Sequence, residues 1–181
     1  MPAPDLSGRW VGCYRQQGRD YPITADFVHA GEHLSGSMRD GHPDRECSVF
    51  EATAEAGLPP GADEWIEARL REMVPDPRSG PIWYVSQLPP ESILEGRCTG
   101  RTVRFRKTYR GTSFGGYRVG DRFVGMRREG HAVDYEGRLS ADGRVIEGRW
   151  WIEADPGIGA RRTEGEFCLR RSRGEPGAEE G

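Results

Sequence analysis

Hydrophobic and polar residues alternate most clearly between Val133 and Glu153, on both sides of a turn at Ser140–Gly143. Side chains two positions apart on a strand share one face of a sheet. One face of the predicted hairpin therefore carries the apolar residues and two glycines: Val133, Tyr135, Gly137, Leu139, Ile146, Gly148, Trp150 and Ile152. A shift of one residue would bury glutamates and arginines, so this face is predicted to be the buried one. Glycines on an inner face are typical of a strongly curved sheet.

Shorter alternating segments, separated by turns rich in glycine, proline and aspartate, run through the rest of the chain. They predict strands over residues 6–15, 21–29, 33–39, 47–56, 82–88, 91–98 and 102–110, and a last strand ending at Arg171. Residues 111–130 are either a further short strand or a mobile flap. Short connections favour antiparallel neighbours, and eight or more such strands close into a barrel or pack as a sandwich. We expect a mainly β fold, an antiparallel up-and-down β-barrel of about eight to ten strands.

Residues 63–74 break the alternation and predict one short inserted amphipathic helix. Their apolar side chains recur at helical spacing, at Ile66, Leu70, Met73 and Val74. A proline at position 75 cannot continue the helix. We expect the apolar stripe to lie on the barrel, over its sheet or over one of its ends.

The composition favours one domain over residues 1–171, followed by a polar, disordered tail over 172–181. With 35% hydrophobic and 30% charged residues, the chain suits a single sheet curled around a small interior. The sequence contains no run of about 18 apolar residues, so it predicts no membrane span. A signal-peptide pattern is not visible either. Every basic residue except Lys107 is arginine, as in GC-rich genomes. We therefore expect a cytoplasmic protein of bacterial type.

Gly8 and Trp10, on the first predicted strand, resemble the Gly-x-Trp pattern of the calycin superfamily, which includes lipocalins, fatty-acid-binding proteins and avidins. The resemblance implies that Trp10 closes one end of the barrel as a structural plug. It also implies that an arginine of the last strand, Arg170 or Arg171, covers the tryptophan. Gly12, Tyr21 and Pro22 add a looser similarity to nitrobindin-type haem barrels. Those proteins place a haem-ligating histidine near the C-terminus, and this chain has no histidine after His131.

Alternation also predicts a candidate ligand site. Val103, Phe105, Lys107 and Tyr109 share one face of their strand, so the only lysine of the chain points inward if the two apolar residues do. A buried ammonium is costly without a partner. It would suit the carboxylate or phosphate of a ligand, with Tyr109 and Tyr135 donating hydrogen bonds and Phe105 and Trp150 forming the wall. Alternatively, the lysine lies near the rim and extends to water.

The basic residues are concentrated between Arg97 and Arg128, where ten are basic and one is acidic. Such a face could bind an acidic protein partner, or its arginines could pair with acidic residues of neighbouring strands. A net charge of −3 does not favour nucleic acid as a partner.

The remaining sequence contains no pattern that specifies metal, cofactor or covalent catalysis. The four cysteines form no Cys-x-x-Cys pair, and the four histidines lack metal-ligand spacing. Nucleophile elbows, phosphate-binding loops and dinucleotide fingerprints are also missing from the sequence. We therefore expect a non-catalytic protein that uses no cofactor and no metal and binds a small anionic or aromatic ligand. The alternatives are a protein-interaction module that uses the basic face, and a small acid–base enzyme of decarboxylase or isomerase type.

Overall fold

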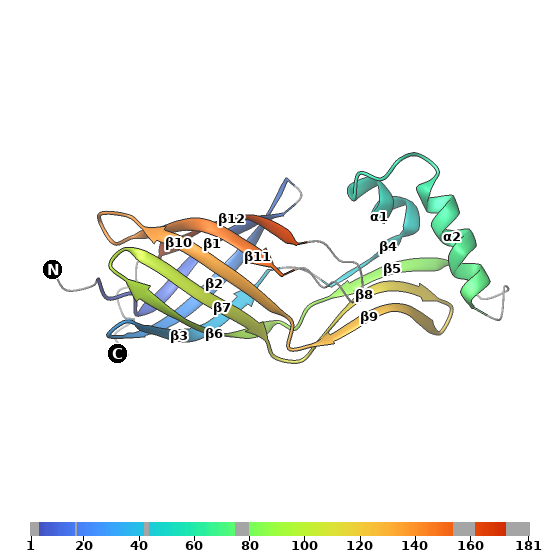
Figure 1. Cartoon of the computed structure of the whole chain (residues 1–181). Helices are drawn as coiled ribbons and strands as arrows, with labels where there is room; N and C mark the ends of the chain where they lie inside the picture. Colours follow the sequence, from blue (N-terminus) through green and yellow to red (C-terminus); the bar gives the residue numbers. More distant parts are fainter. Residues whose placement is uncertain (1–3, 17, 42–43, 75–79, 154–161, 173–181) are drawn as a thin grey trace, which may run out of the picture. The chain divides into compact units, whose positions relative to one another are not determined.

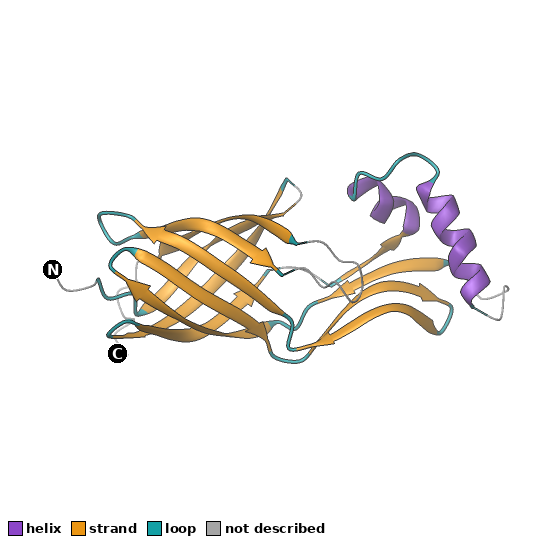
Figure 2. Ribbon diagram, viewed as in Figure 1, coloured by secondary structure: helices purple, strands orange, loops and turns teal. Residues whose placement is uncertain are grey.

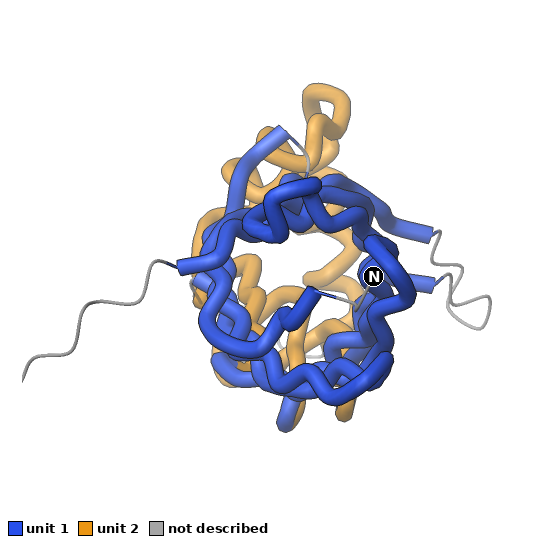
Figure 3. Tube along the Cα trace, turned by 90° about the vertical axis from the view of Figure 1, so that its left-hand side faces the viewer, with its two compact units in different colours: residues 1–42, 90–110, 131–181 blue, residues 43–89, 111–130 orange. Residues whose placement is uncertain are grey.

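The computed structural model describes residues 4–16, 18–41, 44–74, 80–153 and 162–172. In these ranges the chain is mainly β, with twelve strands and two helices (Figures 1 and 2). It divides into two compact units (Figure 3). The first unit combines residues 1–42, 90–110 and 131–181, and the second combines 43–89 and 111–130.

Eight strands of the first unit form a closed antiparallel barrel, in the order β1-β12-β11-β10-β7-β6-β3-β2. They are β1 (Gly8–Gln16), β2 (Arg19–Ala30), β3 (His33–Asp40), β6 (Glu91–Thr99), β7 (Thr102–Tyr109), β10 (Ala132–Leu139), β11 (Val145–Ile152) and β12 (Thr163–Arg171). The first and last strands pair with each other, so the barrel has no open edge. Figure 3 shows this ring end on. The predicted mainly β fold with a closed antiparallel barrel is confirmed.

Aromatic side chains fill the middle of the barrel. Ring centroids lie 6.2 Å apart for Trp10 and Phe27, 5.5 Å for Phe27 and Phe105, and 4.7 Å for Phe105 and Tyr135. Phe167 continues the set, with its centroid 5.1 Å from that of Tyr135. Because these residues come from five different strands, their packing ties the whole ring of strands together.

The hairpin of β10 and β11 buries the face that alternation predicts. Tyr135 and Trp150 lie opposite each other and are 3% and 2% exposed. Gly137 and Gly148 also lie opposite each other, and a Cβ atom on Gly148 would stand only 2.4 Å from the Cα atom of Gly137. Glycine at this position therefore permits the two strands to approach on the concave side.

Trp10 is fully buried in the barrel, and the chain around it supports its position. Its indole Nε1 donates a hydrogen bond to the carbonyl oxygen of Leu6 at 2.9 Å. The guanidinium carbon of Arg171 lies 5.6 Å from the indole centroid, and the same side chain donates to the carbonyl oxygens of Asp5 and Ser7. Of the two candidate arginines, Arg171 is thus the one placed over the tryptophan. Arg170 instead pairs with Val11 across the strands, and Gly8 is exposed at the start of β1.

The second unit is built on a four-stranded antiparallel sheet with the order β4-β5-β8-β9. Its elements are β4 (Arg45–Ser48), α1 (Val49–Glu55), α2 (Ala62–Met73), β5 (Ile82–Gln87), β8 (Thr112–Val119) and β9 (Arg122–Glu129). Residues 111–130, for which the sequence left a short strand or a flap open, thus form a hairpin of two strands.

The strand predicted over residues 47–56 is wrong, because β4 ends at Ser48 and α1 follows at once. Ser48 caps the helix: its hydroxyl accepts a hydrogen bond from the backbone N–H of Glu51, and the Glu51 carboxylate accepts one from the backbone N–H of Ser48. This reciprocal capping box satisfies two backbone donors that a helix start leaves unpaired. Val49 and Thr53 then face the core of the second unit.

The predicted helix over residues 63–74 corresponds to α2, but its apolar stripe packs within the second unit. Leu70, 5% exposed, and Val74, 4% exposed, form a cluster with Val49, Ile82 and Val119. The expectation that the stripe lies on the barrel is therefore wrong for Leu70. Met73, which was expected to belong to the same stripe, is 57% exposed. Since α1 and α2 both pack on the second sheet, that unit has a hydrophobic core of its own.

Where the sequence predicts about eight to ten strands and one helix, the described chain has twelve strands and two helices. Four of the strands belong to the separate sheet. The additional helix is α1, which lies in the segment 47–56 for which the sequence predicts a strand. Of the tail predicted over 172–181, residues 173–181 lie outside the described residues. Neither described helix is long and apolar enough to cross a membrane.

Candidate functional site

Lys107 lies inside the barrel, as the alternation along β7 predicts. Its neighbours on both sides in the chain point outward, and the residue itself is 1% exposed. The rim alternative, in which the ammonium extends to water, does not describe this residue.

The Lys107 ammonium is paired by Asp40, the last residue of β3. Nζ donates to Asp40 Oδ1 at 2.6 Å and also contacts Oδ2, and the Asp40 side chain is 2% exposed. Nζ also contacts the hydroxyl oxygen of Tyr109 at 2.8 Å, and the Tyr109 hydroxyl donates to Asp40 Oδ2. We call Asp40, Lys107 and Tyr109 the buried triad. All three ammonium donors have acceptors, so the charge is compensated inside the protein.

A small residue on the intervening strand gives the triad its space. β6 lies between β3 and β7, and its Ser92 pairs with Met38 on one side and with Tyr109 on the other. The Ser92 hydroxyl turns back to the carbonyl oxygen of Met38 at 2.9 Å. A larger inward side chain at Ser92 would occupy the interior between β3 and β7.

Burial perturbs the titration of the groups around the triad. Burial lowers the pKa of Lys107, and the charge and hydrogen bonds of Asp40 oppose that shift. Burial also raises the pKa of Tyr109, and the negative charge of Asp40 raises it further. The same two causes raise the pKa of Tyr14 and of Tyr135. These tyrosines therefore keep their protons at neutral pH and can act as hydrogen-bond donors.

Flat aromatic surfaces lie beside the triad. The Tyr135 ring stacks on Phe105 with an interplanar angle of 9°. Trp150 meets Tyr14 edge to face at 5.8 Å, and its indole Nε1 donates to the carbonyl oxygen of Arg15 at 3.1 Å. The five residues predicted for the ligand site are thus all buried in the barrel: Phe105, Lys107, Tyr109, Tyr135 and Trp150. Direct contacts join Lys107 with Tyr109 and Phe105 with Tyr135.

Asp40 is the residue that the sequence reading missed. The strand predicted over residues 33–39 stops one residue short of Asp40, although Leu34, Gly36, Met38 and Asp40 continue the inward alternation of β3. Following that alternation to the last strand residue would have placed a carboxylate inside the barrel. Its pairing with Lys107 is a contact between residues far apart in the chain, which local periodicity does not reveal.

The basic segment 97–128 is divided between the two units, and several of its basic residues pair with acidic residues. On the outer wall of the barrel, Arg104 pairs with Glu136 at 2.9 Å and Arg106 pairs with Asp134 at 2.8 Å. In the second unit, Arg118 pairs with Glu46. Pairing with acidic residues therefore accounts for three of this segment's arginines, and for Arg104 and Arg106 the partner lies on the neighbouring strand β10.

Metal ligation finds no support in the described part of the chain. None of its histidine, cysteine, aspartate and glutamate side chains form a group of three or more that could hold a metal ion.

Comparisons with protein-family models, with curated proteins and with solved structures find no match for this chain.

Proposed function

We propose that the barrel binds a small aromatic carboxylate at the buried triad and that the protein acts as a binding protein for it. The buried pair of Lys107 and Asp40 is the observation that carries this proposal. A ligand carboxylate would take the place of the Asp40 carboxylate on the Lys107 ammonium, with Tyr109 as a second donor. The aromatic body would lie against Tyr135 and Trp150 and would have to displace part of the packing around these rings, which are 3% and 2% exposed.

The free-energy cost of burying two charged groups favours a functional role for the pair of Lys107 and Asp40. Replacing a buried ion pair by apolar residues of similar volume is often neutral or stabilising, so such a pair is weak evidence for a role in stability. Apart from Ser92, the rest of the described barrel interior is packed mainly with apolar and aromatic residues that need no charge. Buried groups with shifted pKa values and a specific charged partner are typical of binding and catalytic sites.

Asp40 is suited to give way to a ligand. It is the last residue of β3, so its backbone lies where the strand pairing ends. Lys107 lies within β7, which is hydrogen-bonded on both sides, and Tyr109 is the last residue of that strand. The backbone that carries the ammonium is thus held by strand pairing on both sides, whereas the carboxylate that competes with the ligand sits at a strand end.

Two other functions have less support. A protein-interaction role for the basic face is weakened because Arg104 and Arg106 already have acidic partners. An acid–base enzyme could use the same buried triad for proton transfer. It would be distinguished by turnover of the bound molecule, whereas a binding protein returns it unchanged.

Benzoate is a suitable probe, because it combines one carboxylate with one aromatic ring. Calorimetric titration should compare wild type, Asp40→Asn and the double variant Asp40→Asn/Lys107→Met. We expect Asp40→Asn to bind benzoate more tightly than wild type, because the competing carboxylate is gone. The double variant should bind about 10–100-fold more weakly than Asp40→Asn, equivalent to about 1.5–3 kcal/mol for a charge-assisted hydrogen bond.

Arg106→Met is the matched control, since Arg106 precedes Lys107 on β7 and its ion pair lies on the outer wall. Its benzoate affinity should equal that of wild type. Equal affinities for Asp40→Asn and the double variant would contradict the proposal. Native mass spectrometry of freshly purified protein would show whether a carboxylate copurifies.

A further inference from the structure

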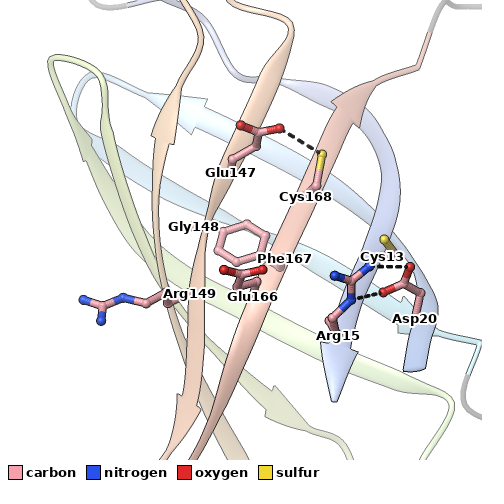
Figure 4. A pocket seen from close by; sticks show the side chains of 9 residues that line it. All are labelled: Cys13, Arg15, Asp20, Glu147, Gly148, Arg149, Glu166, Phe167 and Cys168. Atoms are coloured by element: carbon pink, nitrogen blue, oxygen red, sulfur yellow. Dashed lines mark hydrogen bonds and ion pairs between the residues drawn. The ribbon is translucent and has the colours of Figure 1, made fainter. Parts of the chain in front are cut away.

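Two cysteines that are far apart in the sequence lie directly opposite each other on the barrel. Cys13 on β1 pairs with Cys168 on β12 in the strand register. Their chain neighbours Tyr14 and Phe167 point inward, so both thiols belong to the outer wall. Both are free and partly accessible. Figure 4 shows them on neighbouring strands, beside Arg15 and Glu147.

The strand register sets the separation of the two backbones. The backbone N–H of Ser172 donates to the carbonyl oxygen of Arg9, and this pair lies four positions along the same ladder from Cys13 and Cys168. Hydrogen-bonded pairs recur at every second position, so the two cysteines also form such a pair, with Cα atoms about 5.5 Å apart. Disulfides form across Cα separations of about 4.4–6.8 Å. The backbone thus already has a spacing that a disulfide can bridge.

We propose that Cys13 and Cys168 are a reversible oxidation site, which closes into a cross-strand disulfide in the presence of a disulfide oxidant such as glutathione disulfide. The site joins the first and last strands of the barrel, at the place where the ring of strands closes. It lies on the outer wall and does not depend on the proposed ligand site.

The chemistry balances with glutathione disulfide as the oxidant. One protein thiolate attacks a sulfur of glutathione disulfide, which releases one glutathione thiolate and leaves a mixed disulfide on the protein. The second protein thiolate then attacks the protein sulfur of that mixed disulfide and releases the other glutathione thiolate. The two thiol protons end on the two glutathione molecules, so two electrons pass from the protein to the oxidant.

The surroundings indicate a slow reaction and a bond that is easily reduced. In the reduced protein the Cys168 thiol points to Glu147 Oε1 at 3.8 Å, so it must rotate to reach Cys13. Burial raises the pKa of Cys168, and the nearby Cys13 and Glu147 raise it as well. Opposed Cβ atoms in a ladder stand about 4.5–5.5 Å apart, whereas disulfides prefer about 3.5–4.5 Å. The strands must therefore draw together, and strained disulfides are the labile ones.

The other two cysteines provide an internal control. Cys47 faces Tyr84 on β5, and Cys98 faces Val103 on β7, so neither has a cysteine opposite. The folded protein should be incubated with glutathione disulfide and then analysed by thiol counting, intact mass and peptide mapping under non-reducing conditions. We expect the four thiols to fall to two, a monomer lighter by two hydrogen atoms, and a peptide linking Cys13 to Cys168.

The variants separate this disulfide from general thiol reactivity. Cys47→Ser should still form the link, whereas Cys13→Ser should stop at a mixed disulfide of Cys168 with glutathione. A mild dithiol reductant should restore all four thiols. Four unreacted thiols, mixed disulfides alone in wild type, or links through Cys47 or Cys98 would each overturn the proposal.

Discussion

Replacing Lys107 by methionine should destabilise the barrel strongly, because it leaves the Asp40 carboxylate buried without a cation. The ammonium satisfies both carboxylate oxygens, and the Asp40 side chain is 2% exposed, so water cannot replace the lysine without local opening. After the substitution, the Tyr109 hydroxyl would be the one remaining side-chain donor to the carboxylate among the described residues. Removing one partner of a buried ion pair costs about 3–5 kcal/mol, and we expect a loss of this size.

Urea denaturation followed by circular dichroism measures this loss, with the free energy of unfolding extrapolated to water. Arg106→Met is the control, because Arg106 is the adjacent residue and its ion pair has similar bond lengths but a 59% exposed guanidinium side chain. Exposed pairs contribute about 0–1 kcal/mol, so this variant should remain near wild type. The double variant Asp40→Asn/Lys107→Met should recover most of the lost stability, since no charge remains buried. Equal losses for Lys107→Met and Arg106→Met would refute the view that the buried triad is desolvated.

Three further predictions address the barrel interior and the second unit. The pKa values of Tyr109 and Tyr135 are raised in the folded protein, so the unfolded chain loses these protons near pH 10 while the folded chain keeps them. The free energy of unfolding should therefore fall as pH rises above about 10. An ultraviolet titration in which all six tyrosines ionise before unfolding would contradict this. Leu70→Ala should cost about 2–5 kcal/mol, because it opens a cavity in the second unit's core, whereas exposed Met73→Ala should stay within about 0.5 kcal/mol, as urea denaturation can test. Ser48→Ala should cost about 1 kcal/mol by losing the capping box of α1, and an unchanged unfolding midpoint would argue against that cap.

Periodicity along the chain was sufficient to predict most barrel strands and the faces that they bury, since strand alternation is a local property. The inward positions of Tyr135, Trp150 and Lys107 follow from period-two patterns that a one-residue slip would turn outward. The position of Trp10 beneath an arginine of the last strand came instead from the calycin resemblance. Neither the alternation nor the Gly-x-Trp pattern identifies a ligand.

Periodicity could not predict which strands pair with each other. Strands β5, β8 and β9 lack the regular alternation of the barrel strands, and their hydrogen-bonded neighbours place them in a second sheet. The pairing of Asp40 with Lys107 and the opposition of Cys13 and Cys168 depend on barrel closure in the same way. The helix α1 was a different case, because its Ser48–Glu51 capping box was present in the sequence and was outweighed by an apparent alternation.

The central claim, that the Lys107 ammonium is a buried group available to a carboxylate ligand, can be tested directly because the chain contains no other lysine. Protein labelled with nitrogen-15 only in lysine gives a single side-chain signal in nuclear magnetic resonance spectra. We expect an ammonium signal protected from exchange with water at neutral pH, and a saturable shift of that signal when benzoate is added to the Asp40→Asn variant. A signal that exchanges as fast as that of a solvent-exposed lysine, or one that benzoate leaves unmoved in Asp40→Asn, would contradict the claim.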